Sequence, residues 1–94
     1  MNLSRDSIVV ATPLQVGADL GEEVILLHLT NGHYFGLGNV GARIWKLLRD
    51  PVTIGEIERI LLEEYEVAPE RCHDEVQRLV NQLVDQGLVE VKKA

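Results

Sequence analysis

The sequence has few of the features that would crosslink a small chain or hold it at a membrane. Its 94 residues include one cysteine, Cys72, so no disulfide can form within the chain. A free thiol is typical of a reducing compartment, and we expect a cytoplasmic protein. The longest apolar run, Val24 to Leu27, is far shorter than the roughly 20 residues that a membrane-spanning helix needs. Residues 1–7 contain Arg5 but no apolar segment, so they do not resemble a secretory signal peptide.

Positive charge is also scarce. Lysine and arginine total 9 against 15 aspartates and glutamates, which gives a formal net charge of -6. Such a chain repels phosphate backbones and anionic lipid surfaces. The charge therefore predicts a protein with no nucleic-acid partner and no membrane partner.

What the chain does contain is typical of one globular domain. Hydrophobic residues make up 46% of it and charged residues 26%. A chain of this length can bury enough surface to fold without metal or disulfides, but it is too short for two domains. We expect residues 1–94 to form a single domain, with a frayed tail at residues 92–94.

The N-terminal part of the chain has the composition of short strands. Residues 8–12 are largely β-branched and end at Pro13, which predicts a first strand. A loop through residues 17–21 is expected next. Residues 22–29 and 33–37 then predict the two strands of a hairpin.

The turn of this hairpin is predicted at Asn31-Gly32, because both central positions of a two-residue type I′ turn need a positive φ. That turn would pair Leu26 with Leu37. Both faces of the hairpin are apolar, so either the helices wrap around the second face or a partner covers it. One face carries Val24, Leu26, Phe35 and Leu37, and the other carries Ile25, Leu27, Leu29 and Tyr34.

Two helices are predicted after the hairpin. Asn39 is the expected N-cap of the first, which runs to about Arg49. Thr53 and Glu56 have the spacing of a capping box, in which each side chain binds an end amide of the helix. They open the second helix, which extends to about Tyr65.

A third helix is predicted to begin at Pro69, and Gly87 is suited to end it. Apolar residues recur along it in steps of three and four, the pattern of a buried stripe. Residues 88–91 predict a short closing strand. The stripe consists of Cys72, Val76, Leu79, Val80 and Leu83.

No catalytic or metal-binding pattern is recognisable. His28 and His33 are diagonal neighbours in the predicted hairpin, but two ligands without a third favour simple polar residues at its rim. Residues 36–41 match GxGxxG, yet without a parallel βαβ unit they favour a tight corner between strand and helix. Cys72 lies on the apolar stripe, which favours a packed and inert thiol. We predict a protein that is not an enzyme, with no cofactor and no metal.

Two segments of the sequence point to a family. The stretch Gly32–Leu48, GHYFGLGNVGARIWKLL, followed by TIGEI at residues 53–57, resembles the PqqD-like peptide chaperones, also called RiPP recognition elements. Residues 74–88, DEVQRLVNQLVDQGL, look like the third helix of that family and its end. The resemblance covers nearly the whole chain. The GARIW segment and the chain length look most like the stand-alone members that serve lasso-peptide biosynthesis.

The resemblance implies an α+β, winged-helix-like fold, in which a three-stranded antiparallel sheet is followed by three helices. It also implies that the leader segment of a precursor peptide adds as a strand to the edge of the third strand and lies against the third helix. The residues that would contact the peptide here are His33, Tyr34, Phe35, Gly36, Leu37, Cys72, Glu75, Val76, Arg78 and Leu79.

The residues themselves leave this interpretation open. The segment 33–37 has no proline and no Asp, Glu, Lys or Arg, and Gly36 permits another backbone to approach closely. Those features fit a receptive strand edge, and they also fit an ordinary strand with a bulge. Glu75 and Arg78 border the apolar stripe, where plain surface residues are common.

Three functions are compatible with the sequence. The first is capture of a leader peptide and its delivery to a leader peptidase and a macrocyclase in lasso-peptide biosynthesis. The second is a PqqD-like chaperone for a radical enzyme, which differs only in its client. The third is a winged-helix DNA-binding regulator, which the acidic third helix disfavours because recognition helices need basic side chains near phosphates.

Overall fold

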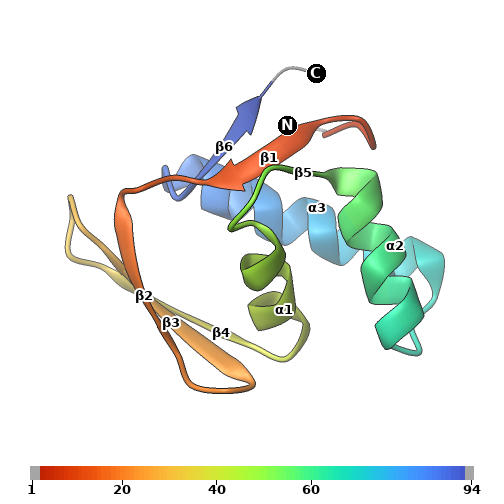
Figure 1. Ribbon diagram of the computed structural model, residues 1–94, viewed down its shortest axis with the longest axis horizontal. Helices are drawn as coiled ribbons and strands as arrows, with labels where there is room; N and C mark the ends of the chain where they lie inside the picture. Colours follow the sequence, from red (N-terminus) through yellow and green to blue (C-terminus); the bar gives the residue numbers. More distant parts are fainter. Residues whose placement is uncertain (1–2, 93–94) are drawn as a thin grey trace.

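The computed structural model describes residues 3–92, which form two small antiparallel sheets and three helices (Figure 1), so the expected α+β class is confirmed. The first sheet has the order β2-β3-β4, with β2 at Gln15–Asp19, β3 at Glu23–His28 and β4 at Tyr34–Gly38. The second has the order β5-β1-β6, with β5 at Val52–Thr53, β1 at Ile8–Ala11 and β6 at Val89–Lys92. The helices are α1 at Val40–Leu47, α2 at Ile54–Glu64 and α3 at Pro69–Asp85.

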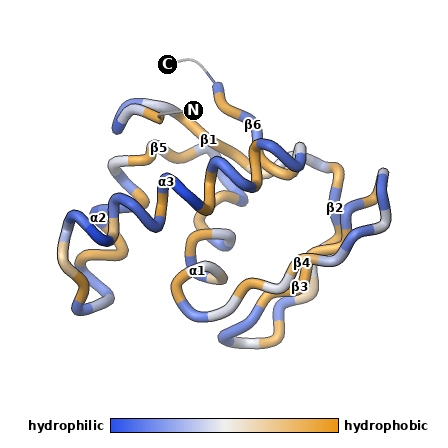
Figure 2. The backbone as a smooth tube through the Cα atoms, turned by 180° about the vertical axis from the view of Figure 1, so that it is seen from behind, coloured by the Kyte–Doolittle hydropathy of each residue, from blue (hydrophilic) through white to orange (hydrophobic). Residues whose placement is uncertain are grey.

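One face of β3 forms part of the core. Val24 and Leu26 point inward and are buried, in the same cluster as Ile44 of α1 and Val76 of α3. Apolar segments run along β3 and β4 in Figure 2, whereas α3 alternates between apolar and polar segments. Both sheets and all three helices therefore share one hydrophobic core.

The opposite face of the β2-β3-β4 sheet stays largely exposed. Val16 is 58% exposed and Tyr34 is 72% exposed, and Leu27 lies between them on β3, with the exposed Ile25 on the same face. The two apolar faces were predicted with the correct residues on each. The helices cover one of these faces and do not wrap around to the other.

The predicted hairpin register is wrong by two residues. Leu26 pairs with Phe35, not with Leu37, and the chain turns through a wider loop at residues 29–33. The buried His28 side chain explains the wider turn, because its Nδ1 accepts a hydrogen bond from the Thr30 N–H at 3.1 Å. The His28 carbonyl accepts another from the Gly32 N–H at 2.9 Å, where Gly32 has a φ of 74°. A shift by two leaves every side chain on its predicted face.

The partners of the first strand also differ from the prediction. Residues 8–11 form a strand as expected, but this strand joins β5 and β6 in the second sheet. The third strand of the hairpin sheet is β2, where the sequence predicted a loop. Its signal is weak because Gly17 and Asp19 are unfavourable in strands. Gly17 is suited to its place, since a Cβ there would lie 3.2 Å from Leu26 Cδ2.

The helix boundaries agree with the sequence to within about two residues. Thr53 caps α2 by accepting a hydrogen bond from the Glu56 N–H at 3.1 Å, whereas the Glu56 carboxylate binds Arg59 and does not complete a capping box. Asn39 is the N-cap of α1 but makes no side-chain cap, and its φ is 50°. The closing strand is present as β6, and Lys93 and Ala94 lie outside the described residues.

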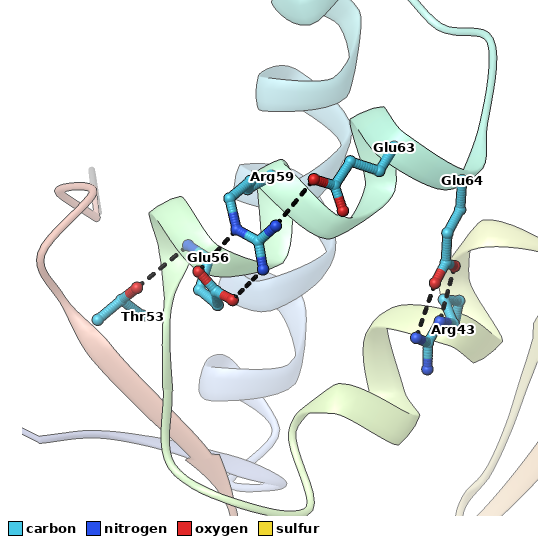
Figure 3. A network of polar contacts seen from close by, with 6 residues as sticks. All are labelled: Arg43, Thr53, Glu56, Arg59, Glu63 and Glu64. Carbon is cyan, nitrogen blue, oxygen red and sulfur yellow. Dashed lines mark hydrogen bonds and ion pairs between the residues drawn. The ribbon is translucent and has the colours of Figure 1, made fainter.

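One ion pair on the surface joins α1 to α2, and two others lie along α2. Both oxygens of Glu64 accept hydrogen bonds at 2.8 Å from the Arg43 guanidinium (Figure 3). The carboxylates of Glu56 and Glu63 hold Arg59 along α2. Arg43 lowers the pKa of Glu64 through its hydrogen bonds and charge. This bidentate pair links α1, which follows β4 directly, to the C-terminal end of α2.

We predict that Val24→Ala lowers the free energy of unfolding by about 2 kcal/mol, because two methyl groups leave a close-packed core. The matched change Val16→Ala, on the exposed face, should alter it by less than about 0.5 kcal/mol. Urea denaturation of the two variants and the wild type measures both values. Equal losses in the two variants would contradict the assignment of the inner face.

Candidate functional site

The free edge of β4 is the most distinctive feature of the first sheet. β4 pairs with β3 on one side, and no described strand pairs with it on the other. In an antiparallel ladder, residue pairs that are hydrogen-bonded alternate with pairs that are not. His28 and His33 form a hydrogen-bonded pair, because the His28 N–H donates to the His33 carbonyl at 2.9 Å. By this alternation Phe35 and Leu37 bond to β3, and the main-chain groups of Tyr34, Gly36 and Gly38 face the free edge. The strand therefore offers unpaired donors and acceptors to an additional strand.

A groove lies between this edge and α3. Its volume is about 510 Å³, and β4 and the C-terminal half of α3 form its two walls. Phe35 and Leu37 are half-buried at its base and pack against the core. The groove is lined by Tyr34, Phe35, Gly36, Leu37, Leu79, Gln82, Leu83, Asp85 and Gln86.

Five of the residues proposed from the sequence meet in this groove. They are Tyr34, Phe35, Gly36, Leu37 and Leu79. Glu75 and Arg78 line a smaller adjoining hollow of about 150 Å³, together with Leu79 and the start of α1. Seven of the ten proposed residues therefore line the groove or the adjoining hollow.

The other three proposed residues lie elsewhere. Val76 is 0% exposed and Cys72 is 3% exposed, so both side chains belong to the core and not to the groove wall. His33 is exposed just before β4, where its N–H donates to Asn31 Oδ1 at 2.9 Å. Their side chains do not line the groove.

Sequence reasoning missed the C-terminal half of α3. Gln82, Leu83, Asp85 and Gln86 form most of the helical wall, whereas the proposed residues stop at Leu79. The signal was present, because steps of three and four residues from Leu79 reach all four of these positions. What could not be read from the sequence is where along α3 the strand β4 would lie.

The histidines do not form a metal site. His28 is buried and lies 2.7 Å through its Nε2 from the Gln86 carbonyl, while its Nδ1 accepts from Thr30 N–H. Both ring nitrogens are therefore engaged, and His28 ties the end of β3 to the end of α3. Within residues 3–92, no three potential ligands lie close enough together to hold a metal ion. No helix in that range is long and apolar enough to span a bilayer.

The comparisons with known proteins agree with this geometry. Residues 23–89 match the model of the family described as coenzyme PQQ synthesis protein D. The fold is similar to the structure described as TbiB1 in complex with the TbiA(beta) leader peptide. That similarity has a TM-score of 0.81 and 33% identity, and it covers 90% of this chain and 99% of the other. A comparison with curated proteins gave no match.

A second solved structure has the same fold. It is described as lasso peptide synthetase B1 complexed with the leader peptide, with a TM-score of 0.76 and 24% identity over 87% of this chain and 96% of the other. The open strand edge beside a helix-walled groove is the architecture of a peptide-binding domain. The chain belongs to the PqqD family of RiPP recognition elements, whose members are non-catalytic peptide-binding proteins.

We predict that Cys72 reacts slowly with a thiol reagent in the folded protein. Burial raises the pKa of its thiol, with a smaller effect from the Glu58 charge, so less of the nucleophilic thiolate is present at neutral pH. Reaction with Ellman's reagent should be about tenfold slower or more than in denaturing urea. The chain has one cysteine, so the signal needs no assignment. Equal rates in both conditions would show that the thiol is accessible.

Proposed function

We propose that this protein binds the leader segment of a ribosomally synthesised precursor peptide by strand addition to β4. The observation that carries the proposal is the free edge of β4 beside a groove of about 510 Å³, with α3 as the facing wall. Main-chain hydrogen bonds to such an edge give affinity for many sequences, and pockets for alternate side chains give selectivity. The described structure of TbiB1 with a leader peptide supports the same use of the fold.

Different parts of the groove make different contacts with the peptide. Tyr34, Gly36 and Gly38 supply main-chain partners, as the ladder alternation indicates. Phe35 and Leu79 offer apolar surface to the peptide side chains that point inward, so leaders with bulky apolar residues at alternate positions are favoured. His33, Glu75 and Arg78 lie at its ends and contribute polar contacts. Cys72 and Val76 support the wall from the core.

We further propose that the domain, residues 1–94, delivers the bound precursor to a leader peptidase and a macrocyclase of a lasso-peptide pathway in the cytoplasm. Its contribution is effective concentration and orientation, not bond chemistry. A strand added to β4 would extend the sheet, so its outward side chains would continue the exposed apolar face around Ile25 and Tyr34. That composite face is our candidate for enzyme docking.

A radical enzyme that modifies peptides is the alternative destination. The family whose model matches this chain is described as coenzyme PQQ synthesis protein D. That description favours the alternative pathway. Binding of the leader would be the same in both pathways. The enzymes encoded by the neighbouring genes would show which of the two pathways this protein serves.

DNA binding receives no support from α3. Its acidic residues Glu70, Asp74, Glu75 and Asp85 outnumber its two arginines, Arg71 and Arg78. A helix of this charge repels phosphates.

The proposal is tested with Gly36→Pro. Proline removes the main-chain N–H that faces the free edge and leaves the bonds to β3 in place, so we expect binding of the leader to weaken about tenfold or more. The matched variant Gly36→Ala keeps that N–H, and open space around the position accepts its methyl group. Its affinity should stay near that of the wild type.

The measurement is an NMR titration of labelled protein with the leader segment of the precursor peptide encoded nearest its gene. Shifts that saturate and concentrate in β4 and α3 are expected. A normal spectrum for Gly36→Pro confirms that the variant is folded. Unchanged affinity in that folded variant would refute strand addition at β4.

A further inference from the structure

The hollow next to the groove has a distinct chemistry. It is lined by the first turn of α1 and by the middle of α3, and it shares Leu79 and Gln82 with the groove beside β4. A peptide strand that follows β4 past Leu37 therefore arrives at this hollow without leaving the surface. Its lining consists of Val40, Gly41, Ile44, Glu75, Arg78, Leu79 and Gln82.

Gly41 keeps the passage between the two spaces open. A Cβ at this position would lie 3.7 Å from Leu37 Cβ and 3.7 Å from Leu79 Cδ2, between the two walls. That is ordinary van der Waals contact, so a side chain would fit there and would fill the space. Because Gly41 carries none, the space between Leu37 and Leu79 is left free where the hollow of about 150 Å³ adjoins the groove.

The two charged side chains in the hollow differ in their ion pairing. The Glu75 carboxylate is engaged by Arg71, with Nε to Oε1 at 3.3 Å. Arg78 has no carboxylate within 4.0 Å of its guanidinium among residues 3–92, although Asp74 lies one turn away on the same helix. The hollow thus presents a guanidinium whose charge is not paired, beside the apolar side chains of Val40 and Leu79.

We infer that Arg78 is a specificity-determining residue that receives an acidic side chain of the leader peptide. The inference rests on the proposed function, since it assigns a second subsite to the same peptide. A carboxylate matches the planar donors of arginine, and charge-assisted hydrogen bonds are stronger than neutral ones. The pair fixes the register of the leader, because main-chain bonds alone would allow it to slide along β4.

The opposite end of the groove differs in charge. Asp85 lines that end, and no arginine or lysine lines the groove or the hollow apart from Arg78. An acidic leader residue is therefore attracted at the Arg78 end and repelled at the Asp85 end. This asymmetry gives the bound peptide a preferred register.

The test uses mRNA display of random extended peptides, selected separately on the wild type and on Arg78→Glu. Arg78 is exposed, so the substitution leaves the core intact. Arg49→Glu is the matched control, because it changes the charge equally at an exposed position that lines neither space. Peptides that shift the amide resonances of residues 34–38 in an NMR spectrum are kept as binders at β4.

The wild type and Arg49→Glu should enrich peptides with an acidic residue at a constant distance from the apolar positions. Arg78→Glu should enrich a basic residue at that distance. Replacing the acidic residue by its amide in one selected peptide should weaken binding to the wild type about tenfold and leave binding to Arg78→Gln unchanged.

Two results would contradict the inference, and only the second would also contradict the proposed function. Peptides that bind at β4 with the same consensus on the wild type and Arg78→Glu would exclude the acidic subsite and leave strand addition standing. A selection that yields no peptide bound at β4 would remove the proposed function and this subsite together.

Discussion

The packing of the inner face of β3 against the helices is the constraint on which the site depends. Val24 and Leu26 are buried in the core beside α1 and α3, and His28 closes the same face with a 2.7 Å contact from Nε2 to the Gln86 carbonyl. β4 is hydrogen-bonded to β3, so the packing of β3 against the helices also fixes the position of β4. The free edge of β4 comes to lie opposite the C-terminal half of α3, and the groove is the space between them.

An open strand edge is a liability that a peptide-binding protein has to retain. Unpaired main-chain groups invite association with other chains, and β4 carries no Asp, Glu, Lys or Arg to prevent it. Two features limit the risk here. The strand is only 5 residues long, and the net charge of -6 keeps copies of the chain apart. The same charge disfavours phosphates and leaves extended peptides as the natural partner of the edge.

Local signals predicted the elements well, and long-range partners poorly. The Thr53 cap, Pro69 at the start of α3 and Gly87 after its end are determined by neighbouring residues, and all three are found in the structure. The hairpin register failed because a buried histidine, and not the Asn-Gly pair, organises the turn. β2 was missed because it is a strand only through its pairing with β3.

The sequence by itself determined the α+β class, the residues on each face of the hairpin and the family, and the family resemblance pointed to the strand whose edge is free. These follow from periodicity, capping and motif residues, which act over a few positions. Only the tertiary structure decided that β1 joins the second sheet and that the groove uses α3 from Leu79 to Gln86, with Cys72 and Val76 in the core. Such facts depend on how elements far apart in the chain pack together. A stripe of apolar residues shows that a helix is buried, but the packing decides which part of the helix another strand will face.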